Sequence, residues 1–275
     1  MTTVPMPSSR GLTWFQALTG ANGIVVDAPR TVRVADAPLG AEITRFIAVC
    51  PDPENRFPRA RHGEVGLDEA WTLALQVRQT ITTDRGQLPR PIVAIVDVSS
   101  QAYGRLEELL GLHLACAAAA DAYAVARLAG HPVVALIVGK AMSGAFLAHG
   151  YQANRLIALD DSGVAVHAMG KSAAARILRC SVDDLELSAT HCPPMAHDIR
   201  TYAEWGLLHA LIHGVNADAP ATWDVDLVRD SLVSAVRDAR RGPRDLSCRL
   251  ARGATHGRAA SREVRQRLAA QWDGD

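Results

Sequence analysis

The chain has 275 residues, of which 48% are apolar, and this is enough to bury the core of one large domain. Lys and Arg together number 29, as do Asp and Glu, so there is no net charge to attract nucleic acid or an anionic membrane. The five scattered cysteines lack the spacing of a zinc site, and we find neither a signal-peptide pattern nor an apolar run long enough to span a bilayer, so we expect a cytoplasmic protein without a metal site.

The first part of the chain predicts two strands and a helix. Residues Ile24–Val34 and Ile43–Cys50 are rich in β-branched side chains and are bounded by Pro, Gly and Asp, which is typical of strands. Pro51–Gly66 is then expected to be a loop. In Leu67–Thr82 the apolar residues recur at helical spacing, and two acidic residues occupy the favourable first turn, so an amphipathic helix is predicted.

The middle of the chain alternates strands and helices. Ile92–Val98 and Pro132–Gly139 are continuous apolar runs, as expected of buried parallel strands. The long Ala-rich segment Arg105–Ala129 between them predicts a helix that ends at a Gly and a Pro. Further strands are expected at Arg155–Asp161 and Val164–Ala168. This order predicts stacked βαβ units and an α/β fold.

Beyond Met169 the sequence predicts helices and no further strand of similar strength. The predicted helices are Ser172–Arg179, Val182–Ser188, Ile199–Ile212 and Val225–Arg241. The last stretch, residues 244–267, is rich in arginine and has little apolar surface. It is either a solvated or partly ordered helical tail or a docking site for an acidic partner.

One turn stands out as a candidate anion site. Val133–Gly150 reads as a buried strand that ends in small residues and leads into a helix. The first N–H groups of a helix have no partner within the helix, so those of Ser143, Gly144 and Ala145 could donate to an oxygen that gains negative charge. Alternatively, Gly144 is small only because the helix packs tightly against the sheet.

Three segments together carry a resemblance to a known family. They are SQAYG at 100–104, GKAMSGAFLAHG at 139–150 and HAMGK at 167–171, with a weaker match over 51–67. The chain resembles crotonase-type carboxyltransferases and, in detail, the gamma subunit of biotin-independent malonate decarboxylase. The resemblance implies a crotonase-like fold of stacked ββα units over residues 1–170. It also implies a helical region over 171–275 that packs on this core and on a partner subunit.

The resemblance also implies an activity and partners. With a beta subunit, the chain would convert malonyl-S-acyl carrier protein to acetyl-S-acyl carrier protein and carbon dioxide. The carrier protein, or delta subunit, would hold the acyl group on a phosphoribosyl-dephospho-coenzyme A arm, and this chain would bind no cofactor directly. An alpha subunit is a further possible partner. Because the chemistry must stabilise an enolate and deliver a proton to carbon, two anion sites and an acid are needed.

The implied site residues follow from the matching segments. The expected catalytic residues are Ser143, Gly144, Ser100, Gln101 and Tyr103. The expected substrate-binding residues are Ala145, Gly104, Lys140 and His149. Some have a structural alternative: Lys140 is equally typical of a solvated strand end, and SSQAYG could be a polar turn. His149 and His167 are possible acids or ordinary core and surface histidines, and the basic loop with Arg56, Arg59, Arg61 and His62 either meets phosphates or is solvated.

Three other functions remain open at this point. In a crotonase-like serine peptidase, Ser143 would attack the substrate with help from His167 and Asp160 or Asp161. In the carboxyltransferase subunit of a biotin-dependent malonate decarboxylase or acyl-CoA carboxylase, the anion site would hold the biotin carbonyl. In a non-catalytic scaffold subunit, replacing Gly144 with a bulky residue would change nothing.

Overall fold

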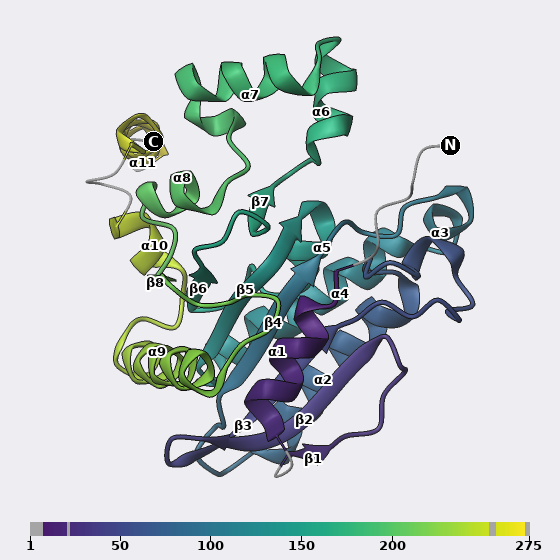
Figure 1. Ribbon diagram of the computed structural model, residues 1–275. Helices are drawn as coiled ribbons and strands as arrows, with labels where there is room; N and C mark the ends of the chain where they lie inside the picture. The colour runs from purple at the N-terminus through teal and green to yellow at the C-terminus, as the bar shows by residue number, and fades with distance from the viewer. Residues whose placement is uncertain (1–7, 21–22, 253–256, 273–275) are drawn as a thin grey trace.

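The computed structural model describes residues 8–20, 23–252 and 257–272, and its centre is one eight-stranded sheet (Figure 1). The strand order is β1-β2-β3-β4-β5-β6-β8, and β7 pairs with the end of β5. The pairs from β3 to β8 are parallel, whereas β1, β2 and β3 are antiparallel. The predicted α/β architecture with parallel strands is therefore confirmed.

The first strands form a hairpin arrangement that differs from the prediction. They are β1 (Ile24–Val25), β2 (Val32–Leu39) and β3 (Glu42–Val49). The single strand predicted over Ile24–Val34 is wrong, because a turn separates β1 from β2. In that turn the N–H of Val32 donates to the carbonyl oxygen of Pro29 at 2.9 Å, and the fixed φ of proline suits such a turn.

The predicted buried strands lie in the middle of the sheet. Every residue of β4 (Ile92–Val98) is buried, as are the first seven residues of β5 (Val133–Met142) and all of β6 (Arg155–Leu159). Side chains on both faces are covered by helices, which explains the continuous apolar runs. The strand β5 continues three residues beyond its predicted end at Gly139 and there pairs with β7 (Ala165–His167).

Two layers of helices cover the sheet (Figure 1). On one face lie α1 (Arg10–Thr19) and α9 (Thr222–Arg241), and on the other lie α2 (Leu67–Thr83) and α4 (Leu112–Leu128). The sequence did not lead us to expect α1. Its Trp14 is fully buried and donates its indole N–H to the carbonyl oxygen of Ala217 at 2.9 Å, which links α1 to the segment between β8 and α9.

The long helix predicted over Arg105–Ala129 is two helices. A short helix, α3 (Arg105–Leu109), precedes α4, and Gly111 between them has φ of 84°. Only glycine adopts this left-handed conformation at little cost, so Gly111 lets the chain change direction before α4. This bend matters for the site, because α3 and the start of α4 form one of its walls.

The C-terminal part is mostly helical but also adds a strand. Its elements are α6 (Lys171–Leu178), α7 (Val182–His191), the 3-10 helix η3 (Pro193–Met195), α8 (Ile199–Glu204), β8 (Ala210–Ile212), α9, α10 (Ser247–Arg252) and α11 (Ala259–Trp272). The helix predicted over Ile199–Ile212 is wrong in its second half: Gly206 has φ of 68° after α8, and β8 then pairs with β6.

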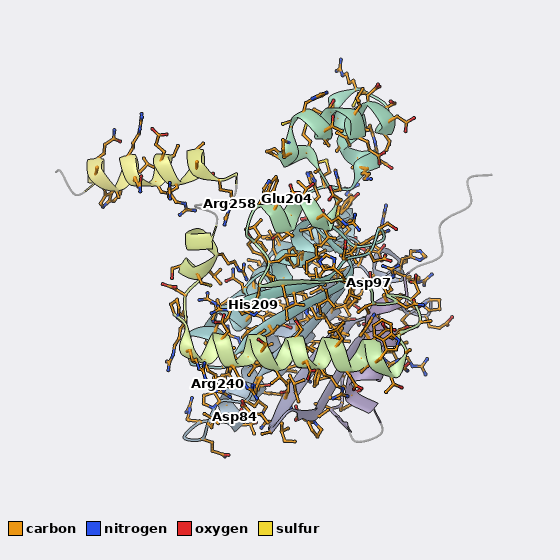
Figure 2. All side chains as sticks on the ribbon, turned by 60° about the vertical axis from the view of Figure 1, so that its left-hand side comes forward. Asp84, Asp97, Glu204, His209, Arg240 and Arg258 are labelled. Carbon is orange, nitrogen blue, oxygen red and sulfur yellow. The ribbon has the colours of Figure 1, made fainter. Side chains whose placement is uncertain are left out.

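Two helical segments extend from the body of the molecule. The pair α6 and α7 stands apart from the sheet, and α11, in which no residue is buried, points away on another side (Figure 2). The division into a core of residues 1–170 and a helical region of 171–275 stays a prediction, and β8 shows that both parts contribute to the sheet. Within the described residues, no helix is both long and apolar enough to cross a membrane.

Candidate active site

The candidate anion site lies where β5 meets the short helix α5 (Ser143–Ala148). Ser143 has φ of 56°, a left-handed conformation that is uncommon for a residue other than glycine. Its hydroxyl donates to the carbonyl oxygen of Ala168 at 2.9 Å and so links the junction to the segment after β7. A strained residue at this position fixes how the following N–H groups point.

Gly144 contacts a residue from the other predicted segment. Its N–H donates to the side-chain oxygen Oε1 of Gln101 at 3.0 Å, although the two residues are 43 positions apart. A Cβ on Gly144 would come within 3.2 Å of that oxygen, so there is little space for a side chain. The structure thus brings together the two segments that the sequence singled out, and the amide of Gln101 covers the expected anion donor.

The loop that carries Gln101 is held by the chain before α2. The N–H of Val65 donates to the carbonyl oxygen of Ser100 at 3.0 Å, and the N–H of Ala102 donates to the carbonyl oxygen of Val65 at 2.8 Å. The hydroxyl of Ser100 donates to the carbonyl oxygen of Gln101 at 2.8 Å. Ser100 therefore supports the loop, and Gln101 is the member of this segment that reaches Gly144.

A pocket of about 350 Å³ opens beside Gln101 and Gly144, a volume suited to a small ligand. It is bounded by α3, one face of α4, and α5, and most of its wall is apolar. It is lined by Gln101, Glu108, Leu112, His113, Cys116, Ala117, Ala120, Gly144, Leu147 and Ala148. The sequence did not single out Glu108, His113 or Cys116 as site residues; His113 and Cys116 share a face of α4, whereas Glu108 lies on α3 and reaches the pocket from across the bend at Gly111.

The pocket wall includes one thiol. Cys116 is partly buried, and burial, with the nearby charge of Glu108, raises its pKa to about 11. The thiol therefore keeps its proton at neutral pH, so it is not a reactive thiolate. Cys116 is therefore a poor proton donor, and the other ionisable groups of the described pocket lining are Glu108 and His113.

Seven of the nine predicted site residues lie outside the lining of this pocket: Ser100 and Ser143, which hold the loop and the junction, His149, and the four described next. Tyr103 is 58% exposed, and Gly104 precedes α3, where a Cβ would come within 2.4 Å of the Glu107 carboxylate. Lys140 has an exposed side chain, and its backbone N–H donates to Asp97 at 3.1 Å. Ala145 is fully buried in the core. Their roles in substrate binding or catalysis stay predictions.

His149 lies in the core with both ring nitrogens engaged. It is fully buried, its Nδ1 lies 3.0 Å from the Tyr123 hydroxyl, and its Nε2 lies 3.0 Å from the carbonyl oxygen of Ile95. Because a carbonyl only accepts, Nε2 carries the proton and Nδ1 accepts from Tyr123. Burial lowers the pKa of His149 to about 4, so the ring is neutral. This geometry fits the core-histidine alternative and leaves no ring nitrogen for a substrate.

The groups that a serine peptidase would need are engaged elsewhere. The hydroxyl of Ser143 donates to a main-chain carbonyl, and Asp160 pairs with Arg200 at 2.6 Å and with His213 at 2.7 Å. Asp161 pairs with Arg10 at 2.7 Å. His167 stacks on His197 with ring centroids 3.9 Å apart. The base and orienting group of a serine nucleophile are therefore not assembled around Ser143.

The basic loop before α2 has its own partners. The exposed Arg56 pairs with Asp68 at 2.6 Å, and Arg61 donates to the carbonyl oxygen of Asn55 at 2.9 Å. Arg59 and His62 are exposed. Arg59 approaches the loop that carries Tyr103, since its Cγ lies 3.6 Å from the Cβ position of Gly104. Phosphate binding by this loop stays a prediction.

Comparison with solved structures places the fold among carboxyltransferases. A Pseudomonas malonate decarboxylase hetero-tetramer in complex with coenzyme A contains a chain that is 56% identical, covering 96% of this chain and 100% of that one, with a TM-score of 0.90. The Pseudomonas MdcD-MdcE hetero-dimer gives 55% identity, the same coverage and a TM-score of 0.88. A transcarboxylase 12S structure, 16% identical over 88% of this chain and 43% of its own, shares the fold with a TM-score of 0.64. The predicted crotonase-like fold is confirmed.

Sequence comparison gives the family. The malonyl-S-ACP:biotin-protein carboxyltransferase MADD of Malonomonas rubra is 31% identical over 222 residues, which are 79% of this chain and 74% of that protein. The family model described as malonate decarboxylase gamma subunit matches residues 60–272, a range that contains the Gln101 loop, the Gly144 junction and the whole pocket. The chain belongs to the malonate decarboxylase gamma subunit family.

Proposed function

We propose that this chain acts with a beta subunit to convert malonyl-S-acyl carrier protein to acetyl-S-acyl carrier protein and carbon dioxide. The observation that carries the proposal is the pairing of Gly144 with Gln101 at the edge of a 350 Å³ pocket, in a chain of this family. On binding, the malonyl carboxylate takes the place of the Gln101 amide oxygen at the N–H of Gly144. Ser143 and Gly144 then form the anion site of this subunit.

This chain needs to supply only one of the two anion sites that the reaction requires. When the carboxylate leaves, negative charge moves to the thioester oxygen, which the beta subunit stabilises in this proposal. The gamma subunit holds the leaving carboxylate and excludes water from the reacting carbon. The reaction therefore requires both subunits, and each supplies one set of donors.

The surface around the pocket supports a partner subunit. Around the pocket, five leucines on α3, directly after it, at the start of α4 and on α5 are more than half exposed: Leu106, Leu109, Leu110, Leu114 and Leu147. Contiguous exposed apolar side chains on a folded protein mark an interaction surface. We assign this surface to the beta subunit, because a partner seated there would close the pocket. The helical region 171–275, with the exposed Ile177, Leu178 and Leu187 on α6 and α7, is proposed to contact the partner as well.

The carrier of the acyl group is proposed to be the delta subunit with its phosphoribosyl-dephospho-coenzyme A arm. The relative from Malonomonas rubra acts on malonyl-S-ACP by its name, and the Pseudomonas hetero-tetramer holds coenzyme A. Both support a thioester substrate on a pantetheine-type arm. An alpha subunit completes the proposed complex. We propose that the whole complex is located in the cytoplasm.

One observation favours a second candidate. The relative from Malonomonas rubra is 31% identical to this chain. By its name, it transfers a carboxyl group from malonyl-S-ACP to a biotin protein. In that case the site at Gly144 would hold the biotin carbonyl. The two functions differ in one measurable property, which is whether carbon dioxide release needs biotin.

The experiment is an assay of carbon dioxide release by the chain co-expressed with its beta subunit. Malonyl-carrier protein and malonyl-coenzyme A are the substrates, with and without a biotin carrier and with avidin as a biotin trap. The variant Gly144→Val fills the space beside Gln101, where even a Cβ comes within 3.2 Å. Gly170→Val is the matched control, because no atom lies within 4 Å of a Cβ at Gly170.

The outcomes separate the candidates. Biotin-independent release that is lost in an assembled Gly144→Val complex and kept in Gly170→Val supports the proposal. Release that requires a biotin carrier supports the second candidate. Unchanged release by Gly144→Val makes this chain a scaffold, and no release from any malonyl thioester excludes decarboxylation.

A further inference from the structure

The pocket beside Gly144 contains ionisable groups that the anion site does not use. Among the described residues that line it, the ionisable ones are Glu108, His113 and Cys116. His113 and Cys116 are three positions apart on α4, so they share a helical face, and α4 packs against α5, which carries Gly144. These groups therefore lie within reach of a ligand held at Gly144 in a pocket of this size.

The acids expected from the sequence lie elsewhere in the structure. Tyr103 is 58% exposed and does not belong to the described lining of the pocket. His149 is fully buried, with one ring nitrogen at the Tyr123 hydroxyl and the other at the carbonyl oxygen of Ile95. His167 stacks on His197, and its Nδ1 lies 2.9 Å from the carbonyl oxygen of Met169. A proton donor must come within hydrogen-bond reach of the reacting carbon.

We infer that His113 is the acid that delivers a proton to the carbon that loses its carboxylate, an inference that rests on the proposed function. His113 lines the same pocket as Gly144 and Gln101, so its imidazole can approach the reacting carbon of a ligand whose carboxylate is held at Gly144. Imidazole is the side chain that most often acts as a general acid or base near neutral pH.

The proton and electron balance of the step is simple. The bond between C2 of the malonyl group and its carboxylate breaks, and the electron pair stays on C2 and the thioester as an enolate. The imidazolium of His113 gives its proton to C2 and forms the methyl group of the acetyl thioester. The neutral imidazole then takes a proton from water, so one proton is consumed for each carbon dioxide released.

The other two groups are less suited to this role. Burial raises the pKa of Cys116 to about 11, with a further contribution from Glu108, so the thiol holds its proton tightly. An ionised carboxylate at Glu108 would repel the malonyl carboxylate and has no proton to give. Substitutions of Glu108 and Cys116 serve as comparison variants, because both residues line the same pocket as His113.

The test uses the assembled complex with the beta subunit and compares His113→Gln with His213→Gln. His213 is an exposed histidine after β8, away from the pocket and from α6 and α7, and is the matched control. Because general acid catalysis contributes about 100- to 10,000-fold, we expect kcat of His113→Gln to fall at least about 100-fold, with KM changed much less. A general acid makes kcat fall as the pH rises, so we expect such a fall in the wild-type complex and none in His113→Gln.

A second variant distinguishes catalysis from structure. His113→Ala leaves a gap that opens on the pocket, and added imidazole should restore much of its kcat, whereas a structural role would not respond. A wild-type kcat and pH profile in His113→Gln overturns the inference. So does a loss that imidazole does not restore, or a pH-dependent decline that disappears in Glu108→Gln or Cys116→Ser instead. Failure of the wild-type complex to release carbon dioxide would instead refute the proposed function.

Discussion

The carboxylate of Asp97 occupies the space that a side chain at Gly139 would need. A Cβ on Gly139 would come within 2.1 Å of Oδ1 of Asp97, and the same carboxylate accepts the N–H groups of Gly11 at 3.2 Å and Lys140 at 3.1 Å. Asp97 lies at the carboxyl end of β4, whereas Asp84 lies beyond the opposite end of that strand (Figure 2). The glycine that opens the matching segment GKAMSGAFLAHG is thus explained by packing against Asp97.

This contact predicts a strong coupling between the two residues. Gly139→Ala should lower the free energy of unfolding by about 1–3 kcal/mol, since an added methyl group in a filled space forces strain. Asp97→Ala should also destabilise, because it leaves buried N–H groups without an acceptor. The double variant should lose less than the sum of the two. Urea unfolding of the four proteins measures this coupling, and strictly additive losses would show that the two side chains do not compete for space.

His149 predicts that the protein loses stability in acid. Burial lowers its pKa to about 4, against an ordinary value near 6.5 in the unfolded chain. Between these values the unfolded state binds a proton that the folded state does not, so stability rises with pH in this window and is lost as pH falls from 6.5 toward 4. The shift corresponds to a loss of about 3 kcal/mol at most.

The matched variant for this prediction is His149→Gln. A glutamine amide can donate to the carbonyl oxygen of Ile95 and accept from Tyr123, but it does not titrate. Urea unfolding at pH 5 and pH 7.5 should show a smaller difference for His149→Gln than for the wild type. An equal difference would mean that other groups cause the acid sensitivity.

The parts of the fold that the sequence predicted are those with a long and regular pattern. The apolar runs of β4 and β5 and the amphipathic α2 were found because burial on both faces, or on one face, leaves a clear period. The strand β8 was missed because three residues, Ala210–Ile212, show no period of their own. Its position is set by pairing with β6, more than 50 residues earlier, and this contact has no local signal.

The candidate site was predicted only in part for the same reason. Gly144 and Gln101 were singled out, but their contact depends on how β4 and β5 pair in the sheet. His149 follows Gly144 closely in sequence, yet its side chain enters the core because α5 has only six residues before the chain turns. His113 lies in an Ala-rich helix with nothing unusual beside it, and the packing of α4 against α5 brings it to the pocket.

Gln101 predicts a specific effect on substrate binding. Gln101→Glu keeps the shape of the side chain but places a negative charge at the N–H of Gly144, where the amide oxygen now accepts at 3.0 Å. A charged acceptor holds that N–H about twice as strongly as a neutral one and repels the malonyl carboxylate. We expect KM for malonyl-carrier protein to rise at least about tenfold in the complex, which is the effect of a loss of 1.4 kcal/mol in binding.

The control is Gln101→Met, which has a similar size and no charge. It leaves the N–H of Gly144 open to the substrate, so KM should rise far less than in Gln101→Glu. If both variants raise KM equally, the amide of Gln101 binds the substrate itself and does not compete with it. If neither variant changes KM, the carboxylate does not bind at Gly144.

Glu69 predicts a link between stability and the site. It is fully buried at the start of α2 and accepts from Thr31 at 2.6 Å, Asn55 at 2.9 Å and the N–H of Gly66 at 2.9 Å. Gly66 follows Val65, which pairs with the loop that carries Gln101. In Glu69→Gln an amide N–H₂ would face one of these donors, which should lower the free energy of unfolding by about 1–3 kcal/mol.

Because the Gln101 loop then loses part of its support, KM should rise at temperatures where the variant remains folded. The exposed Glu54→Gln is the control, with unchanged stability and KM. A Glu69→Gln complex that is less stable but has wild-type KM and kcat would show that the chain before α2 does not position Gln101.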